Sequence, residues 1–220
     1  MRNRFLKAVL VDLDGTLADS LPTLFQFYQT FLSENQCKGT QTEFQHLNGA
    51  TILEVVHYLK KKHHLTKSTE DLYAIYQNGI AEGYAQHIKL FTGAKNVLQH
   101  LYKHGVTLAM VTSAKRPLLD SFLKNHHLSH LFAFTCTGEE IHKGKPSPEI
   151  YEKAFQHLTC AKENVCVIED AKNGIQAALS AGFRVFALNP DFPAHPEVTK
   201  VLNWHEIDVQ LKKHYELSDL

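Results

Sequence analysis

The stretch that most constrains the fold of this chain is residues 8–16, with the sequence AVLVDLDGT. Its four leading apolar residues predict a short strand buried on both faces, as in the middle of a parallel sheet. Asp12 and Asp14 are two residues apart, so their carboxylates point the same way in extended backbone. Two adjacent anions at the end of an apolar strand are unfavourable unless a cation lies between them. Alone, the pattern is equally typical of two solvated aspartates before a turn at Gly15.

Further along the chain, apolar runs of strand length alternate with amphipathic patterns of helical period. The predicted strands are residues 106–111, 131–135, 165–168 and 185–188. The predicted helices are residues 94–104, 117–126, 148–158, 175–181 and 204–215. Continuous apolar strands that alternate with helices indicate an α/β fold with a doubly wound, Rossmann-like parallel sheet. In such a sheet, ligands bind beyond the carboxyl ends of the strands.

Residues 22–87 interrupt this alternation, because they carry apolar residues at helical spacing and contain no convincing strand. Pro22 suits the first turn of a helix, where no backbone N–H is needed. The helical segment follows directly after the first strand and its turn. We therefore predict an α/β core of residues 1–17 and 90–220, with an inserted α-helical cap domain of residues 18–89.

Composition excludes several classes of protein. The chain has 220 residues, enough for one core and a smaller second lobe. It has 23 Lys and Arg against 23 Asp and Glu, so no basic field points to nucleic acid. The four cysteines form no C-x-x-C and indicate reduced thiols. Because no apolar run has transmembrane length and no signal sequence is recognisable, we expect a cytoplasmic protein without membrane or nucleic-acid partners. We expect a monomer or a weak homodimer.

Polar residues gather where the predicted strands end. They are Asp12 and Asp14, Thr112 and Ser113, Glu169 and Asp170, and Lys145 in a loop just before a helix. At one edge of one sheet, clustered carboxylates favour a hard cation such as Mg²⁺. A hydroxyl, backbone N–H groups and an ammonium suit a phosphate. A carboxylate that the metal does not consume can attack phosphorus, which points to phosphoryl transfer.

Four segments of the chain resemble, in order and in spacing, the motifs of the haloacid dehalogenase-like superfamily of phosphotransferases. They are DLDGTL at residues 12–17, VTS at 111–113, KP at 145–146 and IED at 168–170. Residues 169–178 are similar to the branch that contains β-phosphoglucomutase and phosphoglycolate phosphatase, whose helical cap is also inserted after the first motif. Ala171 stands where that branch often has Ser, and we expect only a small loss of hydrogen bonding there.

The resemblance implies a Mg²⁺-dependent phosphatase that hydrolyses small phosphomonoesters through an aspartyl-phosphate. Asp12 is then the nucleophile and a metal ligand. Asp14 is the general acid that protonates the leaving alcohol and later the base that activates water, and its backbone carbonyl binds the metal. Asp170 completes the metal site. Glu169 is either a direct ligand or a holder of metal-bound water.

The resemblance also assigns the groups that hold the substrate. Thr112 and the N–H of Ser113 bind the transferred phosphoryl group, while Lys145 balances charge between its oxygens and the nucleophile. The cap residues expected to face a small phosphorylated metabolite are Ser20, Leu24, Tyr28, Asn48, Gly49, Thr51 and Ile52. For several of these residues, packing inside the cap is an equally good explanation of the side chain found there. Their mixture of apolar and small polar side chains favours a small or moderately apolar leaving group.

Two other functions stay open at this point. A β-phosphoglucomutase-like sugar phosphomutase is the first, but the resemblance places a His and an Arg of that enzyme at Leu24 and Ile52. A catalytically inactive phosphometabolite-binding protein is the second, although no catalytic residue type is missing. Dehalogenases and phosphonatases of the superfamily are disfavoured because they lack the acid found here at Asp14. Hydrolysis of a phosphomonoester is therefore the predicted reaction.

Overall fold

The computed structural model describes residues 4–86 and 88–217 and has a parallel sheet of six strands at its centre. In spatial order the strands are β6 (Phe132–Thr137), β5 (Thr107–Thr112), β2 (Ala8–Val11), β7 (Val165–Glu169), β8 (Arg184–Ala187) and β9 (Val198–Lys200). Every pair of neighbours in this sheet is parallel. The predicted α/β fold with a doubly wound parallel sheet is confirmed.

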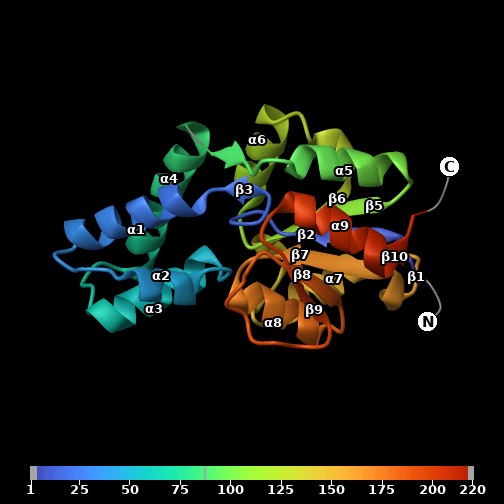
Figure 1. Cartoon of the computed structure of the whole chain (residues 1–220). Coiled ribbons are helices and arrows are strands. Elements are labelled where there is room, and N and C mark those ends of the chain that lie inside the picture. The colour runs from blue at the N-terminus through green and yellow to red at the C-terminus, as the bar shows by residue number, and fades with distance from the viewer. Residues whose placement is uncertain (1–3, 87, 218–220) are drawn as a thin grey trace.

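Helices cover both faces of the sheet (Figure 1). One layer consists of α5 (Ala94–Lys103), α6 (Arg116–Asn125) and α9 (Trp204–His214), and the other of α7 (Glu149–Phe155) and α8 (Lys172–Ser180). Along β2, Val9 and Val11 pack into the first layer, while Ala8 and Leu10 pack into the second. Both faces of the strand are dry, which explains why its sequence is continuously apolar.

A group of helices, here called the helical lobe (residues 21–86), extends to one side of the sheet in Figure 1. It consists of α1 (Leu21–Glu34), α2 (Gln41–Leu47), α3 (Ile52–His63) and α4 (Thr69–Gln86). The lobe lies in the chain between β3 (Ala18–Asp19) and β4 (Lys89–Leu90), which pair in antiparallel fashion. Its interior is a separate apolar cluster around Tyr28, Phe31 and Leu59. The predicted helices are present, and the division into two domains stays a prediction.

Several short elements carry no signal in the sequence. Strand β9 has three residues at a sheet edge, and β1 (Arg4–Phe5) pairs with β10 (Tyr215–Glu216) across the length of the chain. The helix predicted to end at residue 158 ends at Phe155, because the next N–H groups bond to carbonyls three residues back. None of the described helices is long and apolar enough to cross a membrane.

Candidate active site

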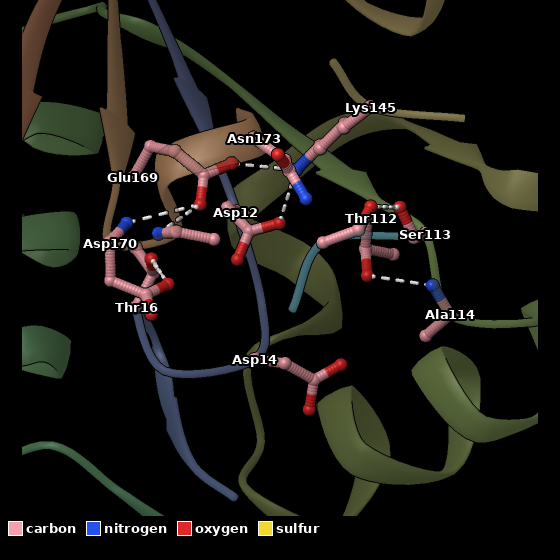
Figure 2. Close-up of polar contacts among 12 residues, drawn as sticks. Asp12, Asp14, Thr16, Thr112, Ser113, Ala114, Lys145, Glu169, Asp170 and Asn173 are labelled. Atoms are coloured by element: carbon pink, nitrogen blue, oxygen red, sulfur yellow. Dashed lines mark hydrogen bonds and ion pairs between the residues drawn. The ribbon is translucent and has the colours of Figure 1, made fainter. Parts of the chain in front are cut away.

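The carboxyl ends of three neighbouring strands meet beside the helical lobe, and the predicted site residues lie there (Figure 2). Val11, the last residue of β2, is paired with Met110 of β5 and with Ile168 of β7, and those strands end only two residues and one residue further on. The residue after Val11 is Asp12, and the residue after Ile168 is Glu169. Parallel register therefore brings acids from distant segments to one edge of the sheet.

Lys145 reaches between two of these acids, as Figure 2 shows. Its Nζ donates to Oδ1 of Asp12 and to Oε2 of Glu169, each at 2.6 Å. Lys145 is 2% exposed and Glu169 is fully buried. Burial alone lowers the pKa of an amine, but the charges of Asp12 and Glu169 raise the pKa of Lys145 well above its ordinary value. The side chain is therefore an ammonium ion bound to both carboxylates.

Glu169 accepts four hydrogen bonds. Its Oε2 accepts from Lys145 and from the hydroxyl of Tyr151 at 2.7 Å. Its Oε1 accepts from the backbone N–H groups of Asp170 and Ala171, each at 3.0 Å. A carboxylate offers about four lone-pair sites, so a cation can bind Glu169 directly only by displacing one of these donors. Tyr151 could not be predicted as a site residue, because its position in α7 belongs to no motif.

In this cluster the carboxyl groups outnumber the one cation, Lys145. Oxygens of Asp12, Glu169 and Asp170 lie within 4.8 Å of one another. Burial and the charge of Glu169 raise the pKa of Asp12 to about 8, although Lys145 opposes the shift. Burial and the charges of Glu169 and Asp12 raise the pKa of Asp170 well above its ordinary value. Because these hard oxygen donors repel one another and outnumber the one lysine, the set fits a divalent cation such as Mg²⁺.

Asp170 is held by three polar side chains. Thr16 Oγ1 donates to Oδ1 of Asp170 at 2.8 Å, and Asn48 Nδ2 donates to Oδ2 at 3.3 Å. Asn189 Nδ2 donates to the backbone carbonyl of Asp170 at 2.7 Å. No role was predicted for Thr16 or Asn189. The sequence does hold a signal for each, because Thr16 belongs to the first motif and Asn189 follows the carboxyl end of β8, where ligands of a parallel sheet bind.

Asp14 faces the junction between the sheet and the helical lobe. Its Oδ1 accepts a hydrogen bond from Ser20 Oγ at 2.5 Å and another from the hydroxyl of Tyr84. Burial raises the pKa of Asp14, and these two hydrogen bonds oppose the shift. Gly15 turns the chain here with φ of +84°, and a Cβ at this position would lie 2.3 Å from the carboxylate of Asp170. The turn therefore requires glycine.

The end of β5 supplies hydroxyl groups. Thr112 is 1% exposed, and its Oγ1 accepts a hydrogen bond from the N–H of Ala114 at 3.0 Å. Ser113 Oγ donates to the backbone carbonyl of Gly49 at 2.6 Å. The latter contact joins the sheet to the helical lobe. Thr112 and Ser113 lie beside the acids, at the edge where the sequence placed the phosphoryl group.

A cavity of about 100 Å³ opens between the helical lobe and the strand ends. From the sheet side it is lined by Asp12, Asp14, Thr112, Ser113, Ala114, Leu118, Glu169 and Ala171. From the lobe side it is lined by Leu24, Phe44, Leu47, Asn48, Gly49, Ala50, Ile52, Val55, Tyr76, Ile80 and Tyr84. The nucleophile and acid predicted from the sequence therefore face the same space as four of the predicted cap residues.

The other three predicted cap residues make contacts of their own. Ser20 donates to Asp14 and does not line the cavity. Tyr28 is buried inside the lobe, where its hydroxyl donates at 2.5 Å to Glu43. Thr51 caps helix α3 by accepting from the N–H of its third residue. Substrate contact by Ser20 stays a prediction, whereas Tyr28 and Thr51 have structural partners that account for them.

Two features together define the class of protein. A doubly wound parallel sheet carries a buried lysine–carboxylate cluster at its strand ends, and helices inserted after the first of these strands lie over the cluster. This is an α/β enzyme with an acidic site compatible with a metal ion. The family model described as haloacid dehalogenase-like hydrolase matches residues 9–188. The chain belongs to this family, as its four motifs predicted.

Similarity to known proteins narrows the class of enzyme further. Hexitol phosphatase A from Escherichia coli is 32% identical over 204 residues, which are 90% of this chain and 90% of that protein. A phosphoglycolate phosphatase from Aliivibrio fischeri is 29% identical over 83% of this chain and 84% of its own length. The crystal structure of a β-phosphoglucomutase from Clostridium difficile has a TM-score of 0.83 at 16% identity and covers 95% of this chain and 96% of that one, which shows the fold alone. The curated relatives support a phosphoric monoester hydrolase.

Proposed function

We propose that this protein is a Mg²⁺-dependent phosphatase that hydrolyses small phosphomonoesters through an aspartyl-phosphate on Asp12. The observation that carries the proposal is the contact between the buried Lys145 and Asp12, at 2.6 Å, directly beyond the carboxyl end of β2. A lysine beside a buried carboxylate favours its ionised, nucleophilic form and attracts a phosphate dianion. The phosphatases among the relatives support the same reaction.

The metal site would consist of the carboxylates of Asp12 and Asp170 with the backbone carbonyl of Asp14. When bound there, Mg²⁺ would neutralise the acids and the phosphoryl oxygens. Glu169 would contribute mainly by fixing Lys145, because its lone pairs already accept four hydrogen bonds. Thr16 and Asn48 would orient Asp170, since both donate to its carboxylate.

In the first half-reaction, an oxygen of Asp12 attacks phosphorus and the bond to the leaving alcohol breaks. Asp14 gives its proton to that alcohol. In the second, Asp14 takes a proton from water, the water oxygen attacks phosphorus, and phosphate leaves with Asp12 restored. Lys145 and Thr112 hold the phosphoryl oxygens throughout. Ser20 and the hydroxyl of Tyr84 both donate to Asp14, so they would orient its carboxylate toward the leaving group.

The test is release of inorganic phosphate from 4-nitrophenyl phosphate with Mg²⁺ and with EDTA. Asp12→Asn should abolish release, because an amide cannot attack phosphorus. Asp208→Asn is the matched control, since Asp208 forms a surface ion pair with Lys212 on α9. Wild-type rates for Asp12→Asn on every phosphomonoester would overturn the nucleophile assignment. Full activity in EDTA would overturn the metal dependence.

A further inference from the structure

The cavity over the acids has an apolar roof. The helical lobe contributes Leu24, Phe44, Leu47, Ile52, Val55, Tyr76 and Ile80 to its wall. These side chains come from all of the lobe helices, so the apolar surface surrounds the space rather than forming one stripe. Val55 and Tyr76 are themselves buried in the core of the lobe. A leaving group above the phosphoryl site would therefore lie against hydrocarbon.

The described part of the chain places no cationic side chain in the wall of this space. None of the described residues in its wall is Lys, Arg or His. Lys145 lies at the base and is held by two carboxylates. Lys115, which follows β5, donates to the side-chain oxygen of Gln77 at 2.8 Å and lies over the ring of Tyr73. Both lysines thus contact other groups of the protein, and neither lines the space that a charged leaving group would enter.

Two of the polar side chains in the wall already donate hydrogen bonds within the protein. Asn48 donates to the carboxylate of Asp170, and Ser113 donates to the carbonyl of Gly49. The charged residues that the structure places in the wall are all acids, namely Asp12, Asp14 and Glu169. A carboxylate or a second phosphate placed here would lose its water, gain no hydrogen-bonded cation and face like charges.

The cavity is also small. Its volume is about 100 Å³, whereas an apolar cavity of about 150 Å³ holds benzene. We propose that the substrate is a phosphomonoester with a small leaving group that is uncharged and mainly apolar. This inference rests on the proposed phosphatase function. It predicts discrimination against phosphomonoesters that carry a carboxylate or a second phosphate.

Three phosphomonoesters of one shape test the inference. They are 3-methylbutyl phosphate, 3-phosphooxypropanamide and 3-phosphooxypropanoate, whose leaving groups differ at their ends as hydrocarbon, amide and carboxylate. We expect kcat/KM to fall in that order. The carboxylate should be at least about 100-fold poorer than the hydrocarbon, the discrimination expected when a buried charge stays unpaired. Equal or faster turnover of the carboxylate overturns the inference and leaves the phosphatase intact.

Two substitutions at one position of the cavity wall test the effect of a positive charge there. Ala50 lines the cavity from the loop between α2 and α3, so Ala50→Lys adds an ammonium there and Ala50→Met adds similar bulk without charge. We expect Ala50→Lys to raise the ratio of kcat/KM for the carboxylate over the hydrocarbon about 10-fold relative to Ala50→Met. An unchanged ratio in folded protein, checked by circular dichroism, overturns the inference. No phosphate release from any of the three esters or from 4-nitrophenyl phosphate overturns the proposed function with it.

Discussion

The hydroxyl of Tyr151 donates a 2.7 Å hydrogen bond to Oε2 of Glu169, the same oxygen that accepts from Lys145. Both the tyrosine and the glutamate are fully buried. The contact links helix α7 to the carboxyl end of β7 and fixes the acid that positions the lysine. The chemistry proposed at Asp12 would therefore depend on a residue that lies outside the four motifs of the chain.

Tyr151→Phe should reduce the free energy of unfolding by about 1–3 kcal/mol, because Glu169 keeps its burial and loses one donor. The ring still fills its space, so no cavity contributes. Urea unfolding followed by circular dichroism measures the change. Tyr102→Phe is the control, since Tyr102 is 50% exposed and should unfold like the wild type. Equal stability of both variants would show that the hydroxyl of Tyr151 contributes nothing to the cluster.

Lys145→Met should abolish phosphate release and lower the free energy of unfolding by about 3–5 kcal/mol, because it leaves two buried carboxylates without their cation. Methionine keeps most of the length of the side chain. Lys143→Met, two residues away in the same loop and exposed, should behave as wild type. Activity of the folded Lys145→Met variant within tenfold of wild type would contradict the assigned role of the lysine.

Mg²⁺ should raise the melting temperature of the wild-type protein, since a bound cation offsets repulsion among Asp12, Glu169 and Asp170. At about 100 times its Kd a ligand adds about 2.7 kcal/mol to the free energy of unfolding. Asp170→Asn should remove most of this increase, and Asp208→Asn should keep it. Thermal scans with increasing Mg²⁺ give the result directly. A Mg²⁺ response of Asp170→Asn equal to that of wild type would exclude this aspartate from the metal site.

The ionisation of Glu43 should make the stability of the helical lobe depend on pH. Its burial raises the pKa, but hydrogen bonds from Tyr28 and His63 outweigh it and lower the pKa of Glu43 below its ordinary value. The folded state thus holds its proton less tightly than the unfolded chain. The stabilisation is therefore complete above the unfolded value of about 4.3 and is lost as pH falls through the lower folded value.

Melting temperatures from pH 7 to pH 3 measure this effect. Glu43→Gln should be less stable than wild type at pH 7, and the difference should shrink as the solution becomes acidic. Glu34→Gln, on an exposed position of α1, is the control and should follow the wild-type curve. A constant difference between Glu43→Gln and wild type across this range would rule out the linkage.

The sequence by itself determined the parallel α/β sheet, the helices inserted after the first strand, and the sheet edge where the acids meet. Its apolar runs fix which strands are buried, and the parallel arrangement sends their carboxyl ends to one edge. Asp12, Asp14, Glu169 and Asp170 could be placed together on that ground alone, whereas Lys145, in a loop, was assigned to the site with the help of the family resemblance. Each of these acids follows from local pattern, because each lies at or next to the end of a periodic segment.

Only the tertiary structure decided which groups hold those acids and what the cavity admits. Thr16 meets Asp170 across 154 residues of sequence, and Tyr84 meets Asp14 across 70. Such contacts depend on how the helical lobe and α7 pack against the sheet, and hydrophobic periodicity records which face of an element is buried but not its partner. Among residues 4–86 and 88–217, the same packing brings no Lys, Arg or His into the cavity wall. The residue pattern predicted a phosphoryl-transfer site, whereas the packing of the helical lobe placed mainly apolar side chains opposite it.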